Sequence, residues 1–310
     1  MLLAGDETLL STLPPGKWIG GTSVNFIAEN GGAMDRERIF VTDITAHAAS
    51  VVVRKYDVKS LSGIGADYPA NGFTVLIVPG MSAAHEAFAK DVQNYPGVFN
   101  SPLIGWISGV ALSEIGKRAP KSFAGNEVAL GNEAVAMHVT LPAAEAAHID
   151  IINLFKQGDG DSIVFEADGF GTSGECRIQG KAANLAAYIA KHQIDTKLPL
   201  VANYNGALIN VSIQACDAEK GTVSFYAPVF KGIEYKFAAP LGDYASTFAD
   251  TVGHAAGANV AFSCNCILNY AYAGLEGKKT GSFVGPITFG EVAYMLLNQT
   301  LAYLSIAKVA

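Results

Sequence analysis

Cys264 and Cys266, separated by one residue, are the side chains whose types and spacing best suit chemistry in this chain. Residues two apart on a β-strand point to the same face, so both sulfurs can meet one ligand or one metal ion. A structural zinc site takes about four ligands, and the sequence offers neither a Cys-x-x-Cys partner nor a histidine close by. Free cysteine is commonly buried as a small apolar residue. We therefore favour core packing for the pair, with pocket lining and metal or redox chemistry as alternatives.

Ser82 is the candidate nucleophile among the hydroxyl side chains. Gly80-Met81-Ser82 joins a predicted strand to a predicted helix, as a nucleophile elbow does, but alanine stands where the motif has its second glycine. A serine at this position also caps a helix. The histidines are scattered and form no motif such as His-Glu-x-x-His: His47, His85, His138, His148, His192 and His254. The sequence thus points away from an enzyme, with a Cys264- or Ser82-dependent enzyme as the alternative.

The segment Gly169–Gly174 matches the Gly-x-Gly-x-x-Gly pattern of dinucleotide-binding loops and follows a predicted strand. In those loops a helix begins at the glycines, so that its N-terminus meets the pyrophosphate. Here residues 175–179 are expected to be extended, and the next helix is expected to begin at Lys181. We therefore expect a hairpin turn at this segment and no nucleotide site.

Alternating strand and helix patterns must position these side chains. Short apolar runs and turn residues predict strands over 73–78, 127–141, 162–167, 200–204, 207–216, 222–226 and 260–266. Capping residues and periodic apolar positions predict helices beginning at Ser82, Pro142, Lys181 and Asp243, the last ending at Gly257, and a final helix over 292–310. The predicted fold is α/β, with two mixed-sheet α/β domains, 1–178 and 179–310, packed against each other.

Composition excludes several classes of function. The chain has 310 residues, about twice the usual length of one domain, and carries 28 acidic against 21 basic side chains, a net charge of −7. Lysine and arginine do not cluster, so we expect no nucleic-acid partner. No signal peptide and no apolar run of roughly 20 residues is evident, so we expect a cytoplasmic location and no membrane association.

Five elements of the second half, taken in order, resemble the C-terminal half of the FIST sensory family. They are Gln179–Ala183, Asp217–Phe225, Val229–Gly232, Phe262–Cys264 and Gly285–Glu291. Trp18–Ser23 and Pro102–Gly109 resemble glycine turns of the family's N-terminal domain. The family usually continues its Phe-Ser-Cys strand into a Gly-Arg pair, where this chain has Cys266 and Ile267. This departure removes a possible clamp for a ligand carboxylate.

The resemblance implies a small-molecule-binding sensory protein, with an amino-acid-like metabolite as the candidate ligand, held in a cleft between the two halves. Its output would pass through a separate signalling protein, and a haem- or metal-binding sensor is the alternative. No cofactor is predicted. For Glu291 we keep two interpretations, an acid favoured at a helix start and a pocket wall that accepts a ligand amine. The expected ligand-binding residues are Gly20, Gly21, Thr22, Tyr204, Cys264, Asn265, Tyr270, Gly285, Thr288, Gly290 and Glu291.

Overall fold

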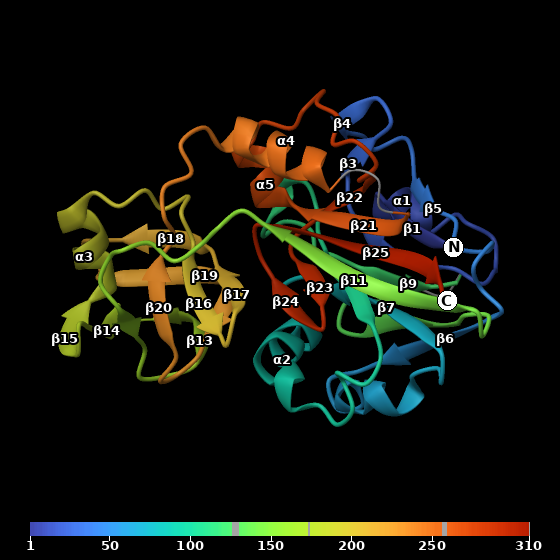
Figure 1. Cartoon of the computed structure of the whole chain (residues 1–310), viewed down its shortest axis with the longest axis horizontal. Coiled ribbons are helices and arrows are strands. Elements are labelled where there is room, and N and C mark those ends of the chain that lie inside the picture. The colour runs from blue at the N-terminus through green and yellow to red at the C-terminus, as the bar shows by residue number, and fades with distance from the viewer. Residues whose placement is uncertain (126–129, 173, 256–258, 310) are drawn as a thin grey trace. The chain divides into compact units, whose positions relative to one another are not determined.

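The computed structural model of the protein describes residues 1–125, 130–172, 174–255 and 259–309. It is a mixed α/β protein built mainly of strands (Figure 1). Its internal contacts define two compact units. Unit 1 comprises Met1–Ile152, Phe248–Leu296 and Thr300–Ala310, and unit 2 comprises Asn153–Thr247 and Leu297–Gln299. These bounds differ from the predicted boundary between residues 178 and 179, because unit 1 is assembled from both ends of the chain.

Unit 1 contains three sheets. The first has the strand order β5 (Phe40–Thr42), β1 (Leu2–Gly5), β2 (Ile19–Thr22) and β9 (Ser122–Ala124). The second has the order β24 (Met295–Leu297), β23 (Glu291–Ala293), β8 (Leu103–Ser108), β7 (Gly72–Pro79), β10 (Ala134–Thr140) and β6 (Ser50–Tyr56). The third has the order β11 (Glu145–Asn153), β25 (Thr300–Lys308), β21 (Val260–Cys266), β22 (Gly285–Thr288), β3 (Asn25–Ala28) and β4 (Gly31–Met34).

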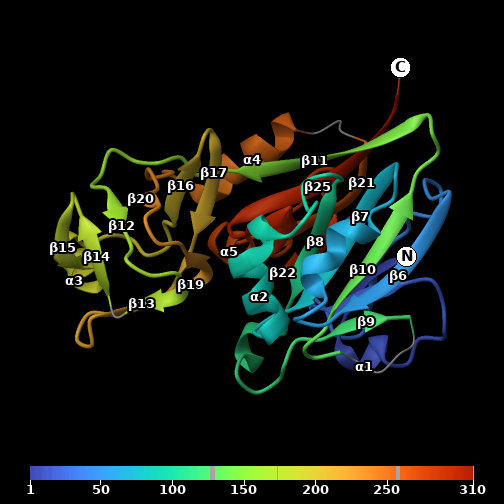
Figure 2. The ribbon, with the colours of Figure 1, turned by 90° about the horizontal axis from the view of Figure 1, so that it is seen from below.

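The second sheet carries the candidate site described below. Figure 2 shows β6, β10, β7 and β8 side by side. Strands β7 and β8 run parallel and are buried along their whole length, which explains the apolar run at residues 73–78, interrupted only by Thr74. Strand β10 pairs antiparallel with β7 on one side and with β6, the strand at the sheet's edge, on the other.

Short helices connect and cover these strands. In unit 1 they are α1 (Glu7–Leu10), α2 (Ala83–Asp91), α5 (Ile267–Tyr272) and the 3₁₀ helices η1 (Leu61–Asp67), η2 (Val92–Asn94) and η3 (Leu112–Glu114). Helix α4 (Tyr244–His254) begins in unit 2 and ends in unit 1. Among the described residues, no helix combines the length and the apolar character needed to cross a membrane.

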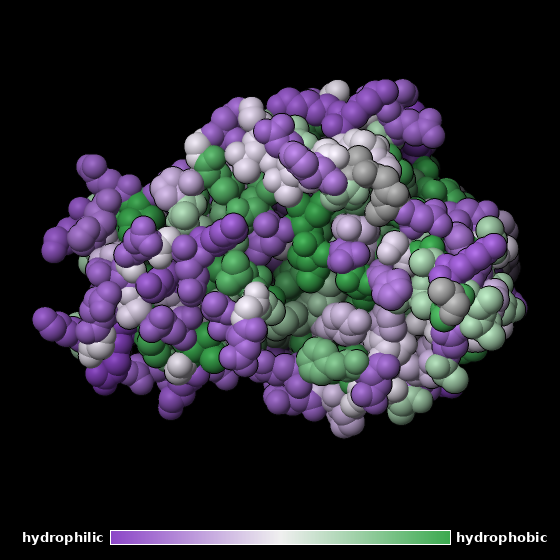
Figure 3. Space-filling model, viewed as in Figure 1, coloured by the Kyte–Doolittle hydropathy of each residue, from purple (hydrophilic) through white to green (hydrophobic). Residues whose placement is uncertain are grey.

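Unit 2 contains two sheets and helix α3 (Leu185–His192). One sheet has the order β15 (Lys181–Asn184), β14 (Glu175–Ile178), β12 (Ile163–Val164), β20 (Glu234–Phe237), β16 (Leu200–Tyr204) and β17 (Ala207–Val211). The other has the order β13 (Gly169–Thr172), β19 (Thr222–Val229) and β18 (Ile213–Asp217). Leu185 and Ile189 of α3 pack in a core with Phe165, Phe225 and Tyr235. The face of unit 2 that Figure 3 shows carries many hydrophilic residues, with hydrophobic ones among them.

The short segment Leu297–Gln299 joins unit 2 through hydrogen bonds to buried polar side chains. The fully buried Asn210 donates from Nδ2 to the carbonyl oxygen of Asn298 (3.1 Å). Ser212 donates from Oγ to Oε1 of Gln299 (2.7 Å). Each bond gives a buried polar group a partner, and a buried group without one is costly. These bonds therefore account for the chain's brief return to unit 2.

Several predicted elements are confirmed. Strands β7, β16, β19 and β21 occupy or overlap their predicted ranges, and β10 falls within the predicted segment 127–141. Ser82 caps α2, because its Oγ accepts a hydrogen bond from the backbone N–H of His85 (3.1 Å). Asp243 lies before α4 and accepts from the N–H of Ala245 (3.2 Å). The expected helix end at Gly257 and the start of segment 127–141 lie outside the described residues.

Two predicted helices are wrong. Residues 145–153 form β11. This strand lies at the edge of its sheet, and buried and exposed side chains alternate only weakly along it. The final helix over 292–310 is instead β23, β24 and β25, so Glu291 does not begin a helix. Tyr294 and Gln299, with φ of 62° and 50°, separate these strands. Each left-handed residue resets the alternation of side chains, so no continuous period of two extends through the tail.

Two further expectations need correction. The predicted helix from Lys181 begins only at Leu185, after strand β15. Residues 175–178 are extended as expected, but the predicted hairpin at Gly169–Gly174 is wrong, because β13 pairs with β19 whereas β14 pairs with β12 and β15. Ser173 of this segment lies outside the described residues. Since no helix begins directly after the glycines, the dinucleotide-loop geometry is absent from the described part of this segment.

An ion-pair network ties the start of α1 to η3 in unit 1. Arg118 contacts both carboxylate oxygens of Asp6 (3.0 and 3.2 Å) and reaches Glu114 (3.4 Å). Arg36 bridges the same two acids, at 3.2 Å from Asp6 and 2.9 Å from Glu114. Burial opposes ionisation of Asp6, but hydrogen bonds from Arg118 and Thr8 outweigh it and lower the pKa of Asp6 to about 2.

Asp6→Asn is expected to weaken the fold at neutral pH and to reduce its sensitivity to acid. The folded-state pKa lies below the unfolded value of 3.8, so the stabilisation is complete above about pH 4 and is lost as the pH falls towards 2. Asparagine still caps α1, so removal of the charge should cost about 1–2 kcal/mol at pH 7. Urea unfolding of both proteins at pH 3 and pH 7 measures this. The same loss in Asp250→Asn, at an exposed position of α4, would contradict it.

Candidate ligand-binding site

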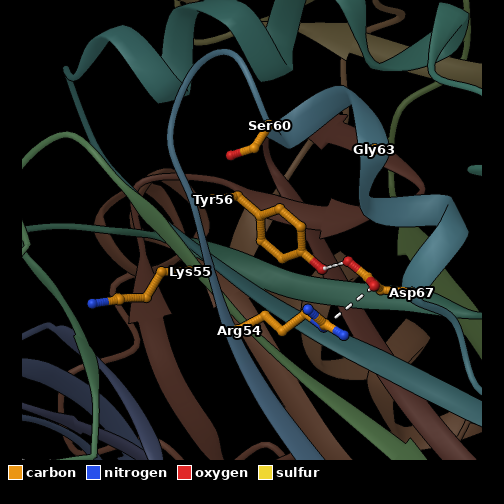
Figure 4. Close-up of a pocket in the computed structure, with 6 residues that line it drawn as sticks. All are labelled: Arg54, Lys55, Tyr56, Ser60, Gly63 and Asp67. Carbon is orange, nitrogen blue, oxygen red and sulfur yellow. Dashed lines mark hydrogen bonds and ion pairs between the residues drawn. The ribbon is translucent and has the colours of Figure 1, made fainter.

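A pocket of about 330 Å³ opens on unit 1 beside the edge strand β6 and the helix η1. Its lining comes from the end of β6, from the turn that follows and from η1: Arg54, Lys55, Tyr56, Ser60, Gly63 and Asp67 (Figure 4). Leu61 and Ile64 of η1 are fully buried, which anchors the helix against the sheet. The pocket is therefore formed by one edge strand and one short helix.

Strand pairing places the polar side chains of this region on one face of the second sheet. Arg54 and Tyr56 lie two residues apart on β6, and their partners on β10 are Ala136 and Ala134. His138, two residues further along β10, therefore points to the same face. The small side chains of Ala134 and Ala136 leave room for the Tyr56 ring to lie along the sheet towards His138, and the ring centroids are 6.2 Å apart.

A chain of hydrogen bonds runs from the pocket into the core. The Tyr56 hydroxyl donates to Oδ2 of Asp67 (2.7 Å) and lies 2.9 Å from Nε2 of His138. On the other side of that ring, Nδ1 lies 2.8 Å from Oγ1 of Thr74, a fully buried residue of β7. The four groups connect a partly exposed carboxylate to the middle of the sheet.

Burial decides the protonation states along this chain. It lowers the pKa of His138 to about 4, although the negative charge of Asp67 acts in the opposite direction. The ring is therefore neutral at physiological pH. Burial, the hydrogen bond to Asp67 and the charge of Asp67 all raise the pKa of Tyr56 well above its usual range. Tyr56 thus remains a hydroxyl donor at every pH at which the protein is expected to be folded.

Opposite charges lie next to each other in the pocket. Nε of Arg54 is 3.2 Å from Oδ1 of Asp67, and their side chains are 54% and 27% exposed. Both groups therefore hold part of their charge open to a ligand. Ser60 lies across the pocket and hydrogen-bonds to Asp57 (2.7 Å), whereas Lys55 points away from the Tyr56–Asp67 pair (Figure 4).

The structure brings several of the predicted site residues together, but inside the core of unit 1. Oγ1 of Thr288 lies 3.3 Å from the carbonyl oxygen of Asn265 and 3.2 Å from Oε1 of Glu291. Thr300 donates to Oε2 of Glu291 (2.6 Å), a contact that the sequence did not suggest. Cys264 donates from Sγ to the carbonyl oxygen of Gly105 (3.2 Å). These side chains are at most 4% exposed and form a buried polar layer, so a ligand role for them remains a prediction that their packing does not favour.

Close packing requires glycine at two of the four predicted positions, Gly21 and Gly285. A Cβ atom on Gly21 would lie 2.7 Å from Ile77 and 2.8 Å from Nε1 of Trp106, and one on Gly285 would lie 1.9 Å from the carbonyl oxygen of Ser263. Gly20 and Gly290 are also buried. Glycine at positions 21 and 285 therefore allows neighbouring groups to approach closely, which explains these two residues without a ligand.

The remaining predicted residues lie apart from this layer or at its border. Thr22, the last residue of β2, accepts a hydrogen bond on Oγ1 from the backbone N–H of Lys121 (2.9 Å). The Tyr270 hydroxyl of α5 donates to Glu276. Tyr204 lies on β16 in unit 2, half-buried beside Tyr235. None of the eleven predicted ligand-binding residues lines the pocket of Figure 4.

The structure disfavours the candidate nucleophiles. Burial, with a smaller contribution from Glu291, raises the pKa of the Cys264 thiol well above its usual range, which opposes formation of the reactive thiolate. The Ser82 hydroxyl donates its proton to the carbonyl oxygen of Pro79 (2.6 Å), so this proton is already engaged in a hydrogen bond. Among the described residues, no group of three or more His, Cys, Asp or Glu side chains is arranged to hold a metal ion.

Sequence reasoning missed Arg54, Tyr56, Asp67 and His138 as a group. The signals were present but weak: Arg54 and Tyr56 alternate on one short strand, and a histidine interrupts the apolar strand β10. Their meeting depends on the register of β6 against β10 and on the fold of η1. Neither the strand register nor the fold of η1 can be deduced from the spacing of residues in the sequence.

Comparison with known proteins gives a family and no activity. A model described as a family of unknown function, DUF6976, matches residues 1–307. No curated protein matches the chain.

Proposed function

Because the chain belongs to the DUF6976 family, whose function is unknown, we propose a function from the geometry of its pocket: binding of a small zwitterionic molecule of the amino-acid type. One observation carries the proposal. A guanidinium and a carboxylate, Arg54 and Asp67, lie side by side in the pocket and are both partly exposed. A ligand with a carboxylate and an ammonium group complements both charges at once.

Exchange of partners explains why such a ligand would bind. The exposed Arg54–Asp67 pair contributes little by itself, since water competes for both charges. An α-amino acid offers a carboxylate that the planar guanidinium can bind through two parallel hydrogen bonds. Its ammonium group offers Asp67 up to three donors. The ligand therefore replaces one weak ion pair with two charge-assisted contacts.

The size of the pocket supports a small ligand. Its volume of about 330 Å³ lies near the lower end of the range of roughly 300–1,000 Å³ that is typical of small-molecule sites. Ser60 and Gly63, on the side of η1, complete its lining. A single amino acid fits this description better than a nucleotide or a haem.

The proposed role is sensory. A binding protein of the FIST-like type would pass ligand occupancy to a separate signalling protein, in the cytoplasm. The pocket lies on β6, at the edge of the second sheet, and on the short helix η1. Such elements at an edge change conformation more easily than central strands do.

Arg54→Ala is expected to lower the affinity for the best-binding amino acid at least tenfold. The standard L-amino acids, each at millimolar concentration, are first screened for a rise in melting temperature, and calorimetry then gives the Kd of the best one. Lys191→Ala is the control, because it removes the same charge from an exposed position of helix α3 that does not line the pocket. A stable protein whose melting temperature no amino acid raises, or equal losses in the two variants, would refute the proposal.

A further inference from the structure

A chain of hydrogen bonds runs behind the pocket, from Thr74 through His138 and Tyr56 to Asp67. Its direction can be worked out from the proton inventory of its members. The Tyr56 hydroxyl has one proton, and it donates that proton to Asp67 (2.7 Å). Its short contact with Nε2 of His138 (2.9 Å) must then use a proton on the histidine nitrogen.

The same reasoning fixes the other end of the chain. A neutral imidazole that carries its proton on Nε2 has a free lone pair on Nδ1. The Oγ1 of Thr74, 2.8 Å away, therefore donates to Nδ1. The protons of Thr74, His138 and Tyr56 all point in one direction, towards Oδ2 of Asp67. Hydrogen bonds arranged in this way polarise and strengthen one another.

We propose that Tyr56 is a positioning residue of the pocket, because this one-directional chain of donors holds the Asp67 carboxylate where it receives a ligand ammonium group and so selects amines. The inference rests on the proposed function of the Arg54–Asp67 pocket. It adds which residue sets specificity and how a buried histidine takes part without being charged.

The two oxygens of Asp67 have separate tasks in this arrangement. Oδ2 is held by Tyr56, whereas Oδ1 faces Nε of Arg54 (3.2 Å). When the ligand carboxylate engages Arg54, Oδ1 becomes the acceptor for the ammonium group and Oδ2 remains tethered. Without the hydrogen bond from Tyr56, the carboxylate can rotate to follow the Arg54 guanidinium or turn towards solvent. The gain from a preorganised acceptor is then lost.

Tyr56→Phe tests the proposal through specificity. It removes only the hydroxyl and leaves the ring beside His138. The best-binding amino acid is compared with its deaminated carboxylic acid, and the variant is expected to lose at least tenfold affinity for the first and less than threefold for the second. Tyr68→Phe is the matched control: its ring centroid is 6.4 Å from that of His138, but its hydroxyl donates to the carbonyl oxygen of Val98. Equal losses for both ligands, or unchanged selectivity, would overturn the positioning role.

A second measurement requires no ligand and therefore separates failure of this inference from failure of the proposed function. In ¹⁵N-histidine-labelled protein at pH 7, with the signal assigned by its absence in His138→Gln, the His138 ring is expected to be the neutral Nε2–H tautomer. Tyr56→Phe should shift this ring towards the Nδ1–H tautomer, because it removes the acceptor of the Nε2–H proton, whereas the Thr74 hydroxyl can accept a proton from Nδ1. An Nδ1–H tautomer in the wild-type protein would reverse the chain and refute the inference, whatever the pocket binds.

Discussion

Glu291→Gln is expected to make the protein more stable above about pH 6 and to leave its stability unchanged near pH 4. Burial raises the pKa of the Glu291 carboxyl to about 8, even though hydrogen bonds from Thr300 and Thr288 favour ionisation. In the unfolded chain the same group ionises near pH 4.5. The folded protein must therefore keep a proton that the unfolded chain releases.

The sign of the effect follows from this difference. Below about pH 4.5 both states are protonated, and Glu291 adds no pH dependence. As the pH rises from 4.5 to 8, the unfolded chain is increasingly favoured, at a cost on the order of 3 kcal/mol by pH 7. Glutamine has no proton to lose, so the variant lacks this penalty.

The surroundings of Glu291 suit a neutral amide. Its Oε2 accepts from Thr300 (2.6 Å), and an amide oxygen can do the same. Its Oε1 lies 3.2 Å from Oγ1 of Thr288, which also donates to the carbonyl oxygen of Gly290 (3.0 Å). A protonated carboxyl or an amide N–H can therefore donate a hydrogen bond to Oγ1 of Thr288. The Thr288 hydroxyl in turn donates to the carbonyl oxygen of Gly290. Each polar atom keeps a partner in the variant.

Urea unfolding at pH 4.5, 6 and 8 measures the effect, with the wild-type protein as the reference for all other titrating groups. Glu291→Ala is the control for packing and should be less stable at every pH, because it leaves a cavity and removes the acceptor of the Thr300 hydroxyl. A Gln variant that is less stable than the wild-type protein at pH 8 would show that the carboxylate is ionised. It would then return Glu291 to the list of groups that can bind a ligand amine.

The elements that could be predicted from the sequence are those that depend on interactions between neighbouring residues. The apolar run of β7 and the cap at Ser82 depend on neighbours in the sequence, and the structure has both. A mixed α/β fold could also be expected from the alternation of patterns. The assignment of segments to two units could not, because Leu297–Gln299 joins unit 2 through partners about 90 residues away, such as Asn210.

The candidate site could not be predicted from the sequence for the same physical reason, its dependence on contacts between distant residues. The predicted glycines and hydroxyls did come together, but around strand contacts in the core. The charged pair Arg54 and Asp67 is joined by η1, a 3₁₀ helix whose pattern is too short to recognise. His138 looked isolated because its partners, Tyr56 and Thr74, are 82 and 64 residues away. Long-range register, and not residue spacing, creates this site.

Close approach of strands also gives the last prediction, in which one substitution has opposite effects at two glycines. Gly105, in the middle of β8, is paired with Leu76 of β7 and has a φ of 156°. A Cβ atom there would lie 1.8 Å from the carbonyl oxygen of Leu76, which is backbone and cannot move aside without separating the two strands. Gly105→Ala is therefore expected to cost more than about 3 kcal/mol or to prevent folding.

Gly253→Ala is the matched substitution in unit 1. This glycine lies exposed near the end of α4, and a Cβ atom there would have no neighbour within 4 Å. Alanine favours the helix over the unfolded chain by about 0.5–1 kcal/mol, so this variant should be slightly more stable than the wild-type protein. Urea unfolding of both variants decides the matter. A mild effect at Gly105 would mean that β7 and β8 can separate at low cost, and the sheet beneath the Arg54 pocket would then be too pliant to hold Asp67 in place.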